Sequence, residues 1–272
     1  MTAHCNQQNA IVSPMRAPGA WAVYAAAMLI FIPCVAATIY FCSSMSGGMP
    51  MPGGWVMSMM WMPMPGQTWL ESAGMFMLMW IAMMVAMMLP SSLPMILRYH
   101  HEQRLAMGRG KRLSTVLMMI GYLFVWGAVG TLVYLPGVLL AIAAMRWTTL
   151  SYAVPYLMGA IIMAAGAFQF TRWKIWALSR CRGPFSCVSL QTHISPWSAW
   201  REGMNCGVCC VTSCFGPTLI LLVLGMMNPA VIVMVAALIA LEKLLPKPEL
   251  IVRISGIAAL VAGLVMISRL VL

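Results

Sequence analysis

Residues 72–97 read SAGMFMLMWIAMMVAMMLPSSLPMIL and contain no charged side chain. This length exceeds the ~20 apolar residues that an α-helix needs to cross the hydrocarbon core of a bilayer. In lipid, the backbone polar groups of a single segment are satisfied internally only when the segment is helical. We therefore predict a membrane-spanning helix here, with Pro90 and Pro94 near its end.

The composition of the whole chain points the same way. Of the 272 residues, 62% are hydrophobic and only 8% are charged, whereas soluble domains carry roughly 25% charged residues. An ordinary soluble domain is excluded, and so is disorder, because the chain is too apolar for it. The net charge is +11. Since the basic residues fall between apolar segments, they indicate membrane orientation rather than nucleic-acid binding.

Seven apolar segments predict the fold class, an all-α polytopic transmembrane helix bundle with about seven spans. The predicted spans cover residues 20–42, 72–97, 114–145, 152–171, 204–227, 230–245 and 251–272. We expect the third span to bend at Pro136. The sixth is short for a complete crossing.

Basic residues predict the orientation. With a cytoplasmic N-terminus, 14 of the 16 Lys and Arg residues lie inside, and only Arg146 and Arg269 lie outside. Such asymmetry is a strong positive-inside signal. It divides the chain into a cytoplasmic segment, residues 1–19, and a membrane bundle, residues 20–272. The bundle includes an irregular Met-, Gly- and Pro-rich outer loop at 43–71 and a basic inner loop at 172–203.

Methionines are concentrated in one region: of 30 in the chain, 15 lie between Met45 and Met88. A thioether is a soft, neutral ligand that suits Cu(I). The expected donors in the outer loop are Met57, Met59, Met60, Met62 and Met64, and those in the second span are Met83 and Met87. The alternative is that these adaptable apolar side chains only fill gaps between helices.

Four cysteines open the fifth span in the pattern C-x2-C-C-x3-C: Cys206, Cys209, Cys210 and Cys214. At 100° per residue they fall within an arc of roughly 140°, on one helix face. A thiolate in a medium of low dielectric constant needs a positive neighbour or a metal ion. One helix cannot surround an ion with four thiols, so we expect a second helix to contribute, with the Met-rich second span as the candidate. Packing against a neighbouring helix is the alternative.

Two further groups carry polar chemistry near the inner membrane face. Glu242 is expected to meet an arginine or a metal site, because a carboxylate at that depth is costly unless it is paired. Lys243 can extend to the membrane surface. Nucleotide-binding, serine-hydrolase and zinc-protease motifs are absent from the sequence, so we predict no catalytic residues.

The chain resembles a bacterial family of uncharacterised membrane proteins, the domain of unknown function 2182. The resemblance rests on Trp80, Met83-Met84, Ala86–Pro94, Gly121-Tyr122, Trp126, Gly166, Gln169, Lys174, Cys181–Pro184, Gly203, Cys206-x2-Cys209-Cys210, Met226–Asn228 and Glu242–Leu244. It implies a predicted metal-binding integral membrane protein. The family pattern has Cys where Ala177 stands, and Trp-x-Leu-Met in place of residues 211–214, so that Cys214 becomes the expected replacement ligand.

The leading hypothesis is an inner-membrane protein that captures, transports or delivers Cu(I) through Met and Cys sulfurs. Expected partners are the lipid bilayer and a copper chaperone or copper-dependent membrane enzyme, with no nucleic acid. Two alternatives stay open. One is a membrane thiol oxidoreductase or an assembly factor for a copper enzyme. The other is a structural membrane subunit without metal.

Overall fold

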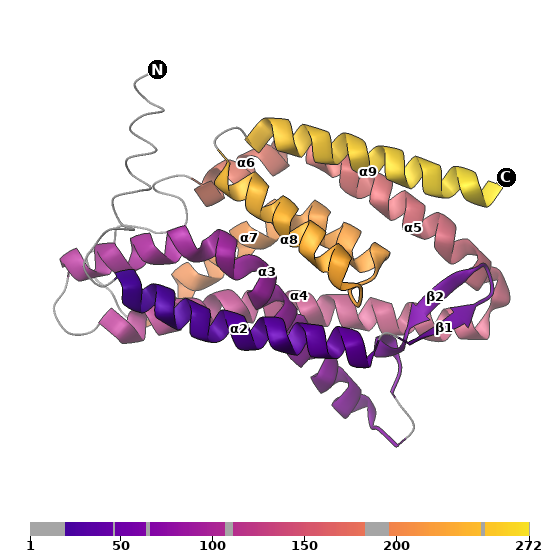
Figure 1. The fold of residues 1–272 in the computed structure, drawn as a ribbon, viewed down its shortest axis with the longest axis horizontal. Coiled ribbons are helices and arrows are strands. Elements are labelled where there is room, and N and C mark those ends of the chain that lie inside the picture. Colours follow the sequence, from indigo (N-terminus) through magenta and orange to yellow (C-terminus); the bar gives the residue numbers. More distant parts are fainter. Residues whose placement is uncertain are drawn as a thin grey trace.

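The computed structural model describes residues 20–45, 47–63, 66–106, 111–182, 196–245 and 248–271. Helices dominate these residues (Figure 1). They are α2 (Ala20–Ser44), α3 (Trp69–Ala106), α4 (Lys111–Arg146), α5 (Thr148–Gln169), α6 (Arg172–Arg182), α7 (Pro196–Leu224), α8 (Pro229–Leu244) and α9 (Pro248–Val271). The all-α bundle predicted from the sequence is confirmed.

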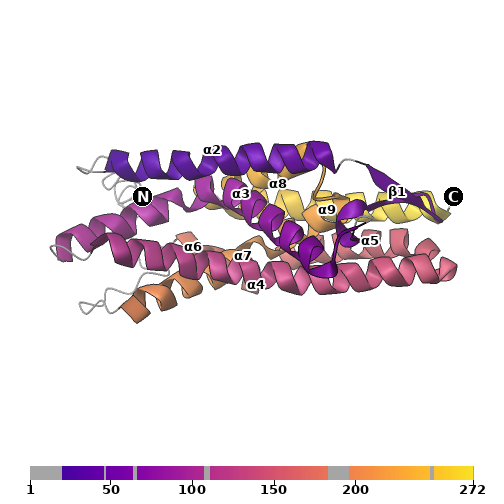
Figure 2. The same ribbon diagram turned by 90° about the horizontal axis from the view of Figure 1, so that it is seen from below.

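In the described ranges, six helices are long and apolar enough to cross a membrane: α2, α3, α4, α5, α7 and α9. Helices α2, α4 and α9 lie roughly along the long axis of the molecule, whereas α3 crosses it obliquely (Figures 1 and 2). Helix α8 has 16 residues, which give a length of about 24 Å against a hydrocarbon core of ~30 Å. The segment expected to be the sixth span is therefore helical but shorter than a full crossing.

Proline residues do not end the spanning helices. Helix α3 continues past Pro90 and Pro94, and α4 continues past Pro136 to Arg146. Membrane helices tolerate proline because neighbouring groups satisfy the freed backbone carbonyls. The expectation of a third span that continues beyond Pro136 is thereby confirmed.

The Met-, Gly- and Pro-rich loop at residues 43–71 is more regular than expected. Strands β1 (Gly48–Met51) and β2 (Trp55–Ser58) form an antiparallel hairpin, followed by the short 3-10 helix η2 (Met59–Trp61). Two hydrogen bonds hold the hairpin to the start of α5: Trp55 Nε1 donates to the Ser151 carbonyl at 3.0 Å, and Ser151 Oγ donates to the Pro52 carbonyl at 2.7 Å. The expectation of an irregular loop was wrong here, because long-range contacts fix a segment whose composition alone favours turns.

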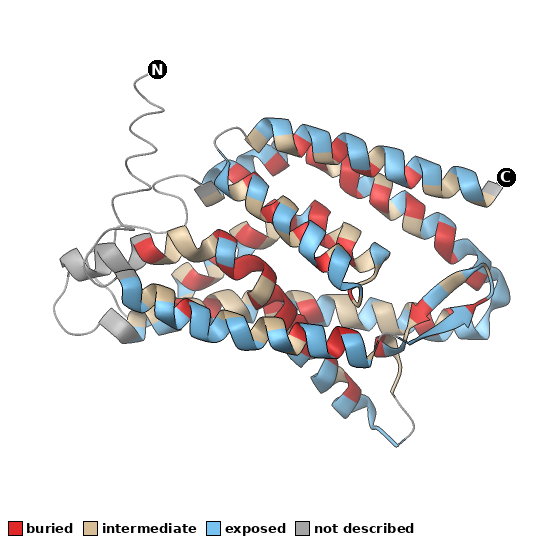
Figure 3. Ribbon diagram, viewed as in Figure 1, coloured by how far each residue is buried: buried red, intermediate tan, exposed pale blue. Residues whose placement is uncertain are grey.

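The centre of the bundle is formed by α3 and α7. Half of the most apolar window of α3 is buried within the protein, compared with 11% for α2, and Figure 3 shows the buried stretch of α3 crossing the middle of the molecule. Helices α4 and α7 approach closely where Gly121 faces the Trp200 carbonyl and Gly203 faces Met118. Small residues allow such backbone contact between membrane helices. This contact fixes α7, which carries the cysteines, against α4.

Candidate metal centre

Three sulfur atoms from two helices meet in the core. Met88 of α3 places its Sδ 4.0 Å from the Sγ of Cys210 and 4.0 Å from the Sγ of Cys214, both on α7. All three side chains are buried. Three sulfurs about 2.3 Å from a single ion in a plane lie about 4 Å apart, and both distances from Met88 match that spacing.

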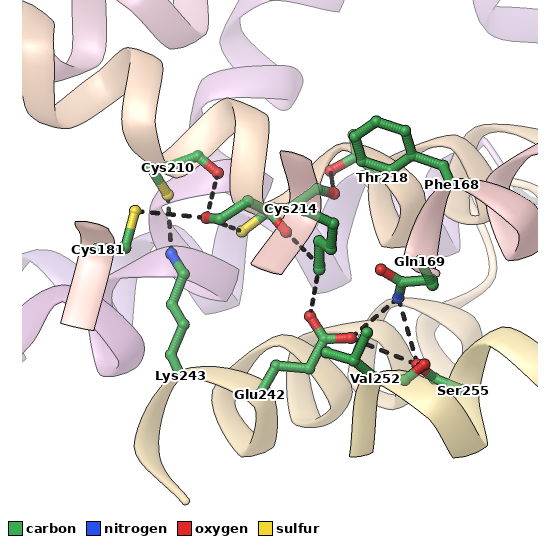
Figure 4. Close-up of polar contacts among 12 residues, drawn as sticks. Phe168, Gln169, Cys181, Cys210, Cys214, Thr218, Glu242, Lys243, Val252 and Ser255 are labelled. Atoms are coloured by element: carbon green, nitrogen blue, oxygen red, sulfur yellow. Dashed lines mark hydrogen bonds and ion pairs between the residues drawn. The ribbon is translucent and has the colours of Figure 1, made fainter. Parts of the chain in front are cut away.

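Two polar groups surround Cys210. Lys243 reaches from α8 and donates from Nζ to Cys210 Sγ at 2.9 Å, as Figure 4 shows. The hydroxyl of Tyr122 on α4 donates to the same sulfur at 3.1 Å. The ammonium supplies the positive charge that a thiolate needs away from water. The expectation that Lys243 extends to the membrane surface was wrong, because Cys210 provides a partner inside the bundle.

A second sulfur group begins with Cys206, three residues before Cys209 along α7, on the side of α4. Cys206 is buried in a cluster with Met118, and Met95 and Tyr122 pack against them. An apolar pocket between α2, α3 and α4 adjoins both sulfur groups. Its lining includes the methionines Met84, Met88, Met95, Met118 and Met119. Five thioethers therefore line this pocket, and two of its lining residues, Met88 and Tyr122, contact the Cys210 thiol.

Cys209 faces a different helix from the other three α7 cysteines. Its Sγ lies 2.6 Å from the Sγ of Cys181 on α6 and 3.6 Å from the Ala177 carbonyl oxygen. Cys181 also lies 3.6 Å from Ser213 Oγ. The face predicted to carry four ligands thus divides, with Cys206, Cys210 and Cys214 toward α3 and α4 and Cys209 toward α6.

A buried charged network lies next to the sulfur atoms (Figure 4). Lys174 of α6, with 0% of its side chain exposed, forms a 2.8 Å ion pair with Glu242 of α8 and donates to the Ser213 carbonyl. Gln169 donates from Nε2 to Glu242 at 2.9 Å and to Ser255 at 3.2 Å. Glu242 is paired, as expected for a carboxylate at that depth, but its partner is Lys174 and not the expected arginine or metal site. Lys174 itself, expected in a basic inner loop, lies inside the protein.

The expected methionine donors occupy several places. Met83 and Met87 are buried in the same core as Cys210 and Cys214, but it is Met88 whose sulfur lies beside the two thiols. Met60 packs in that core as well, whereas Met57 and Met62 belong to a cluster beneath the hairpin, so the structure does not gather these three around one point. Met59 is exposed. Met64 lies outside the described residues.

Several residues of the sulfur contacts and the charged network were missed by reasoning from residue type and spacing. Met88, Tyr122, Cys181 and Lys174 all contact the sulfur or charged network. Each of them is also one of the residues on which the family resemblance rests. The resemblance was therefore the sequence signal that could have identified them. Spacing along one helix could not reveal them, because each comes from a helix other than α7.

The chemistry of the donor atoms indicates which metal ion they suit. Within the described ranges, no three His, Cys, Asp or Glu side chains form a metal-binding group. The group at Cys210 instead combines two thiols with a thioether. Soft sulfur ligands in low coordination number suit Cu(I), whereas Zn²⁺ in structural sites takes four ligands, usually thiolates and imidazoles. The residues present therefore fit a monovalent soft ion better than a zinc ion.

The fold and the sulfur-lined core define a multi-pass membrane protein that brings thiols and a thioether together inside its helix bundle. The chain belongs to the PpoB2 family, described as copper chaperone, and the match covers residues 77–266. That range includes all the residues of the sulfur and charged networks. No curated protein and no solved structure matches the chain. The protein is thus a copper-related membrane protein.

Proposed function

We propose that this protein binds Cu(I) within the membrane at Cys210, Cys214 and Met88 and delivers it to a copper-dependent partner. The observation that carries the proposal is the pair of 4.0 Å distances from one thioether to two buried thiols. The donor set is soft, as Cu(I) prefers. Lys243 lies beside Cys210 and supports the proposal further. Two thiolates around a monovalent ion leave one negative charge, and the ammonium of Lys243 balances it.

Delivery is favoured over pumping. The sequence contains no phosphate-binding loop, and family membership points to a chaperone. The thioether-lined pocket beside Met88 offers a path by which Cu(I) exchanges between neutral ligands before reaching the thiols. Capture by the outer methionines Met57, Met59, Met60, Met62 and Met64 stays a prediction, as do an inner-membrane location, a cytoplasmic N-terminus and the resemblance to the domain of unknown function 2182.

Competition with a chromophoric Cu(I) chelator tests the proposal on the purified full-length protein in detergent. We expect Cys210→Ser, Cys214→Ser and Met88→Leu each to weaken Cu(I) binding at least tenfold, about 1.4 kcal/mol. Met87→Leu is the matched control, since it removes a buried thioether one residue away, and its affinity should stay within about twofold of the unmodified protein. Equal losses in Met87→Leu and Met88→Leu, or none in either cysteine variant, would contradict the proposed site.

A further inference from the structure

The thiols of Cys181 and Cys209 form a pair that the proposed Cu(I) site does not use. Their sulfur atoms are 2.6 Å apart, although the residues lie on different helices, α6 and α7. This separation is about 0.6 Å longer than a disulfide bond. Neither residue is in a disulfide in the structure. Joining the two sulfurs therefore needs little movement of either helix.

The pair lies beside the Cu(I) site without sharing its ligands. Cys181 contacts Ser213 Oγ at 3.6 Å, and the same hydroxyl lies 3.7 Å from Cys214 Sγ. Cys209 precedes Cys210 in the chain but faces α6. Both thiols of the pair are half-buried, whereas Cys210 and Cys214 are buried. The pair is therefore less enclosed by the protein than the Cu(I) ligands are.

We propose that Cys181 and Cys209 reduce Cu(II) to Cu(I) for loading of the neighbouring site. The inference rests on the proposed function in taking copper as the cargo. Two S–H bonds break and one S–S bond forms. The two electrons pass one each to two Cu(II) ions, giving two Cu(I), and two protons leave. A soft sulfur site favours the reduced ion, and thiol–disulfide exchange with an external dithiol returns the pair to its starting state.

A single-turnover experiment tests this reaction. The reduced, desalted full-length protein receives two equivalents of Cu(II) without oxygen, and a chromophoric chelator reports Cu(I). We expect two Cu(I) per chain, an intact mass lower by two hydrogen atoms, and a Cys181–Cys209 linkage in peptide mapping. A linkage between Cys210 and Cys214 instead, or an unchanged mass, would overturn the proposal.

Substitutions separate this activity from Cu(I) binding. Cys181→Ser should lower the yield of Cu(I) at least fivefold while leaving the affinity for added Cu(I) unchanged, which also shows that the variant is folded. Cys34→Ser is the matched control, because Cys34 is likewise half-buried but lies on α2. Cys214→Ser should keep the reduction and lose Cu(I) binding. Undiminished reduction of Cu(II) by the Cys181→Ser variant would refute the proposed role of the Cys181–Cys209 pair. Absent Cu(I) binding in the unmodified protein, with reduction intact, would refute only the proposed function.

Discussion

At the scale of single residues, the buried charges are the least expected feature of this protein. Lys174 and Glu242 are almost completely buried and form an ion pair, with Gln169 and Ser255 filling further acceptor positions of the carboxylate. The desolvation of two charges offsets much of their mutual attraction, so the pair itself adds little stability. Removing only one partner destabilises the protein strongly, because it leaves the other charge unpaired in a medium of low dielectric constant.

Lys174→Met and Glu242→Gln should therefore each destabilise the protein by about 3–5 kcal/mol. In detergent this corresponds to a midpoint of thermal unfolding lower by roughly 5–15 °C. The double variant Lys174→Met/Glu242→Leu should lose less than the sum of the single losses, since it leaves no unpaired charge. Arg253→Met is the control, because Arg253 is exposed on α9. Single variants as stable as Arg253→Met would show that the pair is not buried in the folded protein.

At the scale of elements, a close contact between α4 and α7 positions the metal centre. Gly121 on α4 faces the Trp200 backbone, and Gly203 on α7 faces the Met118 backbone, so that a side chain at either position would collide with main-chain atoms. This approach brings Tyr122 to Cys210 and Met118 to Cys206. The geometry of the sulfur groups therefore depends on two glycines that contribute no ligand.

Two glycine substitutions within the same helix test this dependence. Gly121→Ala should destabilise the protein by about 1–3 kcal/mol, as overpacking does, because the new methyl group meets the Trp200 carbonyl. Gly127→Ala, where no atom lies within 4 Å of the added carbon, should be neutral or stabilising, since alanine favours helix. Thermal unfolding of both variants in detergent measures the difference. Equal midpoints would contradict the close contact.

At the scale of the whole molecule, the two ends differ. The hairpin, the connection between α4 and α5 and the C-terminal end of α9 lie at one end, and the last residues of α3 and α8 lie toward the other (Figure 1). The positive-inside pattern assigns the hairpin end to the outside. On this assignment the buried sulfur atoms of α7 lie nearer the inner face, where reduced thiols persist.

Reporter fusions test this orientation in a bacterial host. Alkaline phosphatase, which is active only outside the cytoplasm, should be active when fused after Leu272, and a fluorescent protein that folds only in the cytoplasm should be bright when fused before Met1. Exchanging the two reporters provides the control, and both should then fall silent. Phosphatase activity from the N-terminal fusion would contradict the predicted orientation. The contacts within the bundle would not be affected by that result.

The sequence by itself determined the membrane bundle. A run of apolar residues long enough to cross the bilayer must be helical whatever its neighbours are, so the spans could be predicted one at a time. The inventory of soft donors was also visible, because the softness of thiols and thioethers follows from residue type. The hairpin of β1 and β2 was not predicted, because contacts from distant segments stabilise it. Helix α6 was not predicted either, because its sequence is short and basic.

Only the tertiary structure decided which donors meet. Neighbouring residues of a helix point about 100° apart, so the choice of Met88 over Met87, and of α6 as the neighbour of Cys209, depends on how each helix is rotated and paired. Rotation and pairing follow from packing over the whole bundle, including the glycine contact of α4 with α7. A pattern read along one helix does not contain that information, because lipid and protein neighbours are equally apolar.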